Sequence, residues 1–319
     1  MTKTSIEKPA PSNSRLSVKN VYTSSIKWSI DRLTIVGELA PFLPAGYTTN
    51  KISGEVKSRI TIEDMFKVFE HFGHCRLSGN GYQMITDDGE NVAYFERLKF
   101  DKNKGRLDFN PNKLDSFFEN GLKQFISDLF ITPHFSRADI AADIFDVPDE
   151  KVVSYRLGEP VGNTFFYGKS GDLQTAYFGA RSSEKQIRLY NKRIERIKKG
   201  RIEDLKDPEQ CYWRLELQLR RGRADDFQKQ VDESLKHFYS PQDFPDDVSV
   251  NSRIFLKGLL ADPDNWARIS RPTKSKYRQI EERVASSDKL TIELKKTFSQ
   301  QNKKIEKELK NWLQTFQVL

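Results

Sequence analysis

The sequence contains little cysteine and no long apolar run, and both absences exclude classes of protein. Cys75 and Cys211 are the only cysteines among 319 residues, which is too few for a disulfide framework and predicts a reducing compartment, the cytoplasm. No apolar stretch approaches the ~20 residues that span a bilayer, so we expect neither a membrane segment nor a membrane partner. Residues 1–20 are polar and lack the apolar core of a secretory signal. We expect them to form a flexible tail.

Several motifs of well-known enzyme classes are also missing. The four histidines form no His-x-His pair, and the two cysteines form no Cys-x-x-Cys pair. The sequence has no glycine-rich phosphate loop and no Gly-x-Ser-x-Gly motif. Zinc sites, P-loop NTPases and serine hydrolases therefore have no support.

Positive charge is in excess and is unevenly distributed. There are 53 Lys and Arg against 45 Asp and Glu, a net charge of +8, which favours a polyanionic partner and most simply nucleic acid. Residues 251–319 hold 15 basic and 8 acidic side chains, and residues 181–201 hold nine basic and two acidic ones. Two separate basic regions predict two separate contacts with one long anion.

Composition and periodicity divide the chain into zones and predict an α+β fold. After the tail, residues 21–239 mix strand-like and helix-like runs, and we expect a domain with an antiparallel sheet and helices packed on one of its faces. Residues 240–248 are rich in Pro and Asp and are the expected linker. Residues 249–319 are mostly helix-forming and basic. They predict a smaller, mainly α-helical basic region.

Five segments of the first zone predict strands. Residues 163–179 are two aromatic runs around a Gly/Asp turn, the pattern of a hairpin. Residues 135–146 and 212–220 alternate between apolar and polar positions, so each would have one apolar and one polar face. Residues 30–36 and 106–110 are shorter candidates.

The polar face of this sheet carries a pattern that could bind a cation. Arg137-x-Asp139 and Arg214-x-Glu216 each place an arginine and a carboxylate on one side of a strand. If the two strands are neighbours, Asp139 and Glu216 could lie within reach of one hard cation such as Mg²⁺ or Mn²⁺. The alternative is that both pairs are exposed salt bridges of the sheet.

A tyrosine flanked by cations is the candidate nucleophile. In a strand, Arg188, Tyr190 and Lys192 project from the same face. A phenol has a pKa near 10, so attack on a phosphodiester requires nearby positive charge or a base. Residues 187–197 also match helical spacing, which would make Tyr190 a core aromatic. We prefer a strand through Tyr190, a turn at Asn191 and then a helix.

Six short motifs occur in order at residues 30–37, 106–114, 136–143, 177–183, 187–192 and 213–217. Taken together they resemble the Rep_trans family, the replication initiators of staphylococcal-type rolling-circle plasmids from Gram-positive bacteria. Weaker similarity continues through Trp266 and residues 276–278. The resemblance implies that residues 21–239 are the catalytic domain and that residues 249–319 recognise origin DNA.

The resemblance implies a reaction and roles for the acidic residues. Family members are site-specific endonucleases and strand transferases that nick one strand of the double-strand origin at an extruded hairpin. Tyr190 would attack the scissile phosphate and stay linked to the 5′ end, leaving a 3′-OH primer, with help from a divalent ion. Asp139 and Glu216 are the first-choice ligands of Mg²⁺ or Mn²⁺, with Asp31 as a third from the edge of its strand. Asp143 is either a ligand or a base.

The resemblance also assigns DNA contacts and partners. Arg188 and Lys192 would contact the scissile phosphate, with Arg181 and Arg214 nearby. Origin specificity in the family lies after the position of Trp266, and the alternative for any one residue there is a solvated basic surface. The host supplies a superfamily 1 helicase, and the partner DNA is the plasmid origin hairpin in the bacterial cytoplasm. The candidate origin-recognition residues are Arg268, Arg271, Lys274 and Lys276.

The number of strand transfers predicts a homodimer. Rolling-circle replication needs two transfers, and a tyrosine already linked to DNA cannot make the second. Only Tyr190 lies in the required motif, so a second copy is the economical source of another nucleophile. Family members behave as dimers, by resemblance.

Two other functions are compatible with a reactive tyrosine and a basic chain. One is a tyrosine recombinase or type I topoisomerase-like strand transferase. The other is a DNA-binding regulator without catalysis, in which Tyr190 and the carboxylates are structural.

Overall fold

The computed structural model describes residues 25–40, 74–86, 89–159, 161–202, 205, 207 and 209–314. The expected tail at residues 1–20 lies outside them. Within the described residues no helix has both the length and the apolar character of a membrane span. In the same part of the chain, Cys75 and Cys211 are both half-buried and are not joined in a disulfide.

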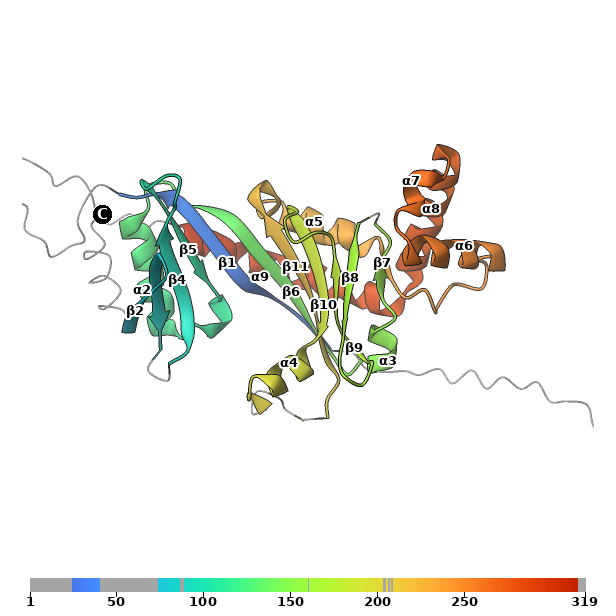
Figure 1. The fold of residues 1–319 in the computed structure, drawn as a ribbon, viewed down its shortest axis with the longest axis horizontal. Helices are drawn as coiled ribbons and strands as arrows, with labels where there is room; N and C mark the ends of the chain where they lie inside the picture. Colours follow the sequence, from blue (N-terminus) through green and yellow to red (C-terminus); the bar gives the residue numbers. More distant parts are fainter. Residues whose placement is uncertain are drawn as a thin grey trace, which may run out of the picture.

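An antiparallel sheet of ten strands forms the centre of the described chain (Figure 1). The strand order is β2-β3-β4-β5-β1-β6-β11-β10-β9-β8. Each of the five segments predicted to contain strands does so. The strands are β1 Ser25–Glu38, β2 His74–Ser78, β3 Gly81–Ile85, β4 Asn91–Arg97, β5 Lys104–Phe109, β6 His134–Phe145, β8 Asn163–Tyr167, β9 Leu173–Phe178, β10 Lys185–Asn191 and β11 Tyr212–Arg220.

Helices follow or connect these strands, and two short strands form a second sheet. β7 (Arg156–Leu157) pairs with β12 (Phe238–Tyr239). The helices are α2 Ser116–Leu129, α3 Asp149–Val152, α4 Lys192–Lys198, α5 Phe227–Leu235, α6 Val250–Ala261, α7 Asn265–Arg268, α8 Arg271–Ser287 and α9 Lys289–Leu313.

The main core lies between one face of the sheet and helices α2, α5 and α9. α9 begins after Asp288, whose side chain accepts a hydrogen bond from the backbone N–H of Thr291 and so caps the helix. Its apolar residues recur at helical spacing, and Phe298 packs on Trp28 of β1 with ring centroids 4.8 Å apart. Burial of each such side chain contributes about 1.5–3 kcal/mol. The prediction of an α+β fold with helices on one face of an antiparallel sheet is confirmed.

The helical region expected at residues 249–319 has two structural parts. Helices α6 to α8 gather at one end of the molecule (Figure 1) and share small cores of their own, one of them around Leu256 and Trp266. α9 instead runs along the sheet and belongs to the main core. The long-range burial of its apolar stripe therefore places this helix with the sheet and not with the other three.

Candidate active site

Tyr190 lies where strand β10 changes into helix α4. The strand ends at Asn191, whose side chain accepts a hydrogen bond from the backbone N–H of Ile194 at 2.9 Å. Asparagine is among the best residues for capping a helix start, because its side chain satisfies a backbone donor that the helix leaves free. The predicted order of strand, turn at Asn191 and helix is confirmed. The alternative of a helix through Tyr190 is wrong.

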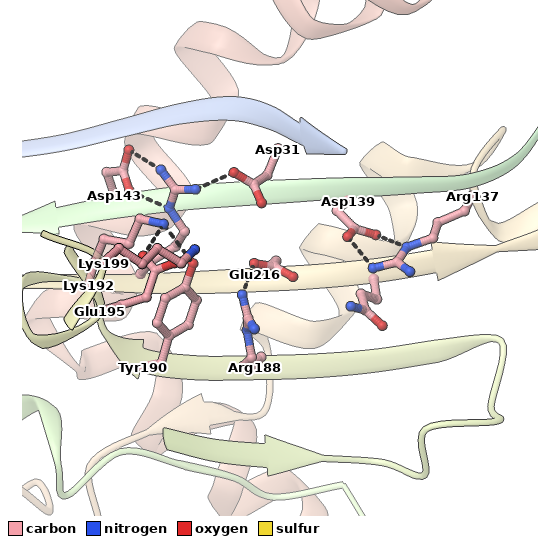
Figure 2. A network of polar contacts seen from close by, with 12 residues as sticks. Asp31, Arg137, Asp139, Asp143, Arg188, Tyr190, Lys192, Glu195, Lys199 and Glu216 are labelled. Atoms are coloured by element: carbon pink, nitrogen blue, oxygen red, sulfur yellow. Dashed lines mark hydrogen bonds and ion pairs between the residues drawn. The ribbon is translucent and has the colours of Figure 1, made fainter. Parts of the chain in front are cut away.

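The phenol of Tyr190 is held between two cations. The Lys192 ammonium donates a hydrogen bond to its hydroxyl at 3.3 Å, and the Arg188 guanidinium lies over its ring, 3.9 Å from the centroid. Figure 2 shows Tyr190, Lys192 and Arg188 on the same side of β10. Tyr190 is only 4% exposed, but its hydroxyl lies among polar groups and not in the apolar core.

Burial works against ionisation of this phenol. It is the main reason that the pKa of Tyr190 stands above its usual range, and Glu216 and Asp31 raise the pKa further. Arg214 and Arg188 lower the pKa and offset part of the shift. Burial also lowers the pKa of Lys192, followed by repulsion from Arg214, while Glu195 raises it. The resting tyrosine is therefore protonated and needs more positive charge around it to act as a phenolate.

Arg214 joins two of the predicted acidic residues. Its Nε and Nη2 atoms donate to the two carboxylate oxygens of Asp143 at 2.6 and 2.9 Å, and its Nη1 atom donates to Asp31. The Tyr212 hydroxyl donates to Asp143 at 2.9 Å. In the sheet, Arg214 lies directly opposite both Tyr190 and Asp143. Asp143 is thus held by two donor residues, in the same row of the sheet as Tyr190 and separated from it by Arg214.

Glu216 and Asp139 lie on neighbouring strands, as the predicted cation site required. Strand β11 pairs with β6, but Glu216 lies opposite Ala141 and Asp139 lies opposite Gln218. The two carboxylates are therefore diagonal neighbours. They are 2% and 1% exposed. Of the two salt bridges considered as the alternative, the one between Arg137 and Asp139 forms, and its carboxylate is buried. Arg214 pairs with Asp143 and Asp31 and not with Glu216.

Each of these two carboxylates has an arginine partner. Arg188 donates to Glu216 at 2.7 Å, and Arg137 donates to both oxygens of Asp139 at 2.7 and 2.5 Å. Burial nevertheless raises the pKa of Asp139 to about 7, against the opposing effect of Arg137, with Glu216 and Asp31 adding to the rise. The raised pKa of Asp139 therefore reflects its burial and not the lack of a cationic partner.

Asp31 does not lie near the edge of its strand, which corrects the expected position. It occupies the middle of β1, where the pairing with β6 shifts between Ile30 and Arg32. A bulge of this kind adds one residue and changes which side chains face the core. Ile30 and Leu33 are both fully buried, although three residues apart. The bulge turns Asp31 toward Arg214 on the polar face (Figure 2).

The carboxylates are of the chemical type that binds divalent cations, but they are not arranged around a common metal position. Asp31, Asp139 and Glu216 offer the oxygen donors that Mg²⁺ and Mn²⁺ prefer. Each of the three is bonded to an arginine, however, and the described part of the chain gathers no group of three or more potential ligands. Metal binding stays a prediction.

The remaining predicted DNA contacts lie away from Tyr190. Arg181 is exposed in the turn before β10, whereas Tyr190 is near the other end of that strand. The four candidates for origin recognition lie on α7 and the first turns of α8, at one end of the molecule (Figure 1). Arg268, Arg271 and Lys276 are exposed and Lys274 is half-buried.

Two residues of the site were not predicted from the sequence. Tyr212 holds Asp143, and its position two residues before Arg214 on an alternating strand could have revealed their shared face. Glu195 forms an ion pair with Lys192 at 2.5 Å. Its spacing of three residues along a helix was the available signal.

Comparison with known proteins gives relatives over nearly the whole chain. The chain is similar to a replication initiation protein of Staphylococcus aureus, with 29% identity over 310 residues, 96% of this chain and 90% of the relative. A second replication initiation protein of that organism is 29% identical over 311 residues, again 96% of this chain and 90% of the relative. No family model matches the chain. The Rep_trans family itself therefore stays a prediction.

One solved structure is also similar, at a lower level. It is a rolling circle replication initiator protein from Geobacillus stearothermophilus, with a TM-score of 0.41 and 15% sequence identity. The alignment covers 76% of this chain and 97% of that chain.

Proposed function

We propose that this protein is a replication initiator of rolling-circle plasmids, which nicks one DNA strand at the origin and rejoins it at termination. Two lines of support are independent of each other. The relatives from Staphylococcus aureus are named replication initiation proteins. The observation that carries the chemistry is the contact of one phenol, Tyr190, with both Lys192 and Arg188 on a polar sheet face.

The proposed reaction is a transesterification at one phosphodiester. The phenolic oxygen of Tyr190 attacks phosphorus, the new Tyr–O–P bond forms, and the bond from phosphorus to the 3′ oxygen breaks. The phenolic proton leaves Tyr190, and the departing 3′ oxygen takes up a proton. The products are a 5′-phosphotyrosine and a free 3′-OH. Because one phosphodiester replaces another, the same groups can reseal the strand.

The cations around Tyr190 have defined tasks in this reaction. Lys192 stabilises the phenolate through the hydrogen bond that already joins the two side chains. Arg188, whose guanidinium lies between the Tyr190 ring and Glu216, is placed to meet a non-bridging phosphate oxygen. Asp143 acts by orienting Arg214. A Mg²⁺ or Mn²⁺ ion could be held by Asp31, Asp139 and Glu216 only if these carboxylates gave up their arginine partners, and it would then supply further positive charge to the phosphate.

The partners of the reaction are part of the same proposal. Helices α7 and α8 carry exposed arginine and lysine side chains at a distance from Tyr190, as suits contact with origin duplex outside the nick. A homodimer would provide the second tyrosine. A host superfamily 1 helicase would unwind the nicked origin.

A covalent-adduct assay tests the proposed nucleophile. The wild-type protein is incubated with Mn²⁺ and an oligonucleotide of the plasmid origin hairpin, labelled at either end. We expect an adduct that retains only the label on the 3′ side of the nick, because the protein is linked to the new 5′ end. Tyr190→Phe should form no adduct while still binding the DNA.

The assay also separates the rival functions. Linkage to the 3′ end, unaffected by a chelator, would indicate a tyrosine recombinase. Binding with no covalent band from the wild type would indicate a regulator. An adduct that persists in Tyr190→Phe would exclude this tyrosine as the nucleophile.

A further inference from the structure

The row of side chains that contains Tyr190 continues to the edge of the sheet. Tyr190 lies opposite Thr175 on β9, and Thr175 lies opposite Phe166 on β8. In the adjacent row, Arg188 lies opposite Tyr177. Directly opposed residues of antiparallel strands project from the same face. Phe166 and Tyr177 therefore share the polar face with the proposed nucleophile.

Phe166 is a large apolar side chain in an exposed position. It is 54% exposed, and its ring meets Tyr177 edge to face with centroids 5.7 Å apart. Its neighbour Phe165 points to the other face and packs on Phe178 at the main core. The fold thus packs one phenylalanine of the pair, half-buried, against the core and leaves the other largely in solvent. Core packing does not explain why residue 166 is aromatic.

Charge favours this side of Tyr190 as the path of a DNA strand. On strands β11, β6 and β1 the face carries Glu216, Asp143, Asp139 and Asp31, whose arginine partners on these three strands are occupied by the carboxylates and are not free to bind phosphates. On β9 and β8 the corresponding side chains are neutral, and Arg188 lies between them and the carboxylates. An unpaired strand bound at Tyr190 is therefore best accommodated toward β8.

We propose that Phe166 and Tyr177 form a stacking platform for unpaired bases next to the scissile phosphate. The proposal rests on the proposed function, since it takes Tyr190 as the point of attack. Phe166 is two strands from Tyr190, roughly 10 Å, which a base close to the attacked phosphate can reach. Stacking on aromatic rings binds single-stranded DNA with little sequence preference, because every base has a flat π face.

Binding without catalysis tests the platform. In the Tyr190→Phe background, affinity is measured for an oligothymidylate of about 12 nucleotides that carries one 2-aminopurine, whose fluorescence is quenched by stacking. We expect Phe166→Ala to weaken binding about 5- to 100-fold and to reduce the quench, since one base stacked on an aromatic ring is worth about 1–3 kcal/mol. Phe166→Trp should restore both.

The matched control is Phe117→Ala, which removes another exposed phenylalanine, on α2. We expect it to change neither affinity nor quench. Equal affinity and quench in Phe166→Ala and Phe117→Ala would overturn the platform. So would a change of oligomeric state in size-exclusion chromatography of Phe166→Ala, which would assign the ring to an interface between copies.

Failure of the platform and failure of the proposed function give different results. If the wild type forms no covalent adduct but Phe166→Ala still loses affinity, nicking is wrong, and Phe166 stacks on single-stranded DNA that the protein binds without cutting. If adducts form normally and Phe166→Ala binds like the control, nicking stands and the platform is wrong.

Discussion

Lys192 and Tyr190 are joined by a hydrogen bond across the junction of a strand and a helix. The tyrosine is the penultimate residue of β10, and the lysine is the first residue of α4. Asn191, between them, caps the helix and so fixes the direction in which Lys192 leaves the strand. The cap therefore positions the cation that stabilises the proposed phenolate.

Removal of that cation should change the pH dependence of nicking. Below the phenol pKa the nicking rate rises with pH, as more of Tyr190 becomes phenolate. Lys192→Met raises this pKa further, so the rise should move to higher pH. The rate near neutrality should fall about 10- to 100-fold, as expected for loss of a hydrogen bond to a charged group. Single-turnover adduct formation across pH measures both effects.

Lys198→Met is the control for Lys192. Lys198 is on the same helix but donates to Gln174 and not to Tyr190. Its substitution should leave the pH profile unchanged. An unchanged profile in Lys192→Met as well would remove the lysine from the mechanism.

Arg214 should be essential for stability as well as for the site. Arg214→Met leaves buried Asp143 and the nearby Asp31 without their cation, and breaking a buried pair in this way costs about 3–5 kcal/mol. Arg32→Met breaks the bidentate pair between Arg32 and Asp108. The Arg32 side chain is 46% exposed. An exposed pair is worth about 0–1 kcal/mol.

Urea denaturation of the two variants measures the difference between them. We expect a lower midpoint for Arg214→Met and nearly wild-type behaviour for Arg32→Met. Similar midpoints would contradict the view that the Arg214 network is an integral part of the interior.

Asp139 should make stability depend on pH in a direction opposite to that of most carboxylates. Its pKa is raised from 3.8 to about 7 in the folded protein, so the folded state binds this proton more tightly than the unfolded chain does. Its contribution therefore destabilises the fold as pH rises from about 4 to 7, and the loss is reversed as pH falls. Free energies of unfolding between pH 4 and 8 should show this component in the wild type and not in Asp139→Asn.

A substitution in an exposed turn provides the reference for Asp139. Asp172→Asn, between β8 and β9, should retain the wild-type dependence on pH. If Asp139→Asn retains it too, the carboxyl at residue 139 titrates as an ordinary aspartate.

Divalent cations should stabilise the protein through the same face. We expect Mn²⁺ to raise the melting temperature of the wild type, with about 2.7 kcal/mol of added stability at a hundredfold excess over the dissociation constant. Glu216→Gln and Asp139→Asn should abolish the rise, and Asp172→Asn should keep it. Calorimetry with and without Mn²⁺ measures this rise in melting temperature independently of any nicking activity. An equal rise in all variants would place the ion elsewhere.

The exposed cations of α7 and α8 should govern duplex binding and not nicking. Alanine at Arg268, Arg271 and Lys276 should weaken origin duplex binding and reduce its salt dependence by about one unit of slope per lost phosphate contact. Adduct formation on a single-stranded hairpin should persist. Alanine at Lys303 and Lys307, exposed on α9, is the control for general positive charge. Loss of nicking on single strands would argue against separate tasks for the two regions.

Local patterns in the sequence determined the elements and the faces of the sheet. Alternation along β6 and β11 gave the polar face that holds Asp139 and Glu216, and the capping preference of Asn191 gave the end of β10. These features depend on neighbours within a few residues, so the sequence contains them directly. The change in the alternation of apolar positions between Ile30 and Leu33 is also visible in the sequence, and it indicates a bulge.

Tertiary packing decided how the strands are aligned and which helices share a core. The register between β6 and β11, which makes Asp139 and Glu216 diagonal neighbours, is fixed by contacts far apart in the chain. The packing of α9 on β1 through Phe298 and Trp28 also depends on residues that are far apart in the chain. The sequence by itself determined which side chains share one face of the sheet. Only the packed sheet decided their distances, because those depend on burial of apolar residues that are remote in sequence.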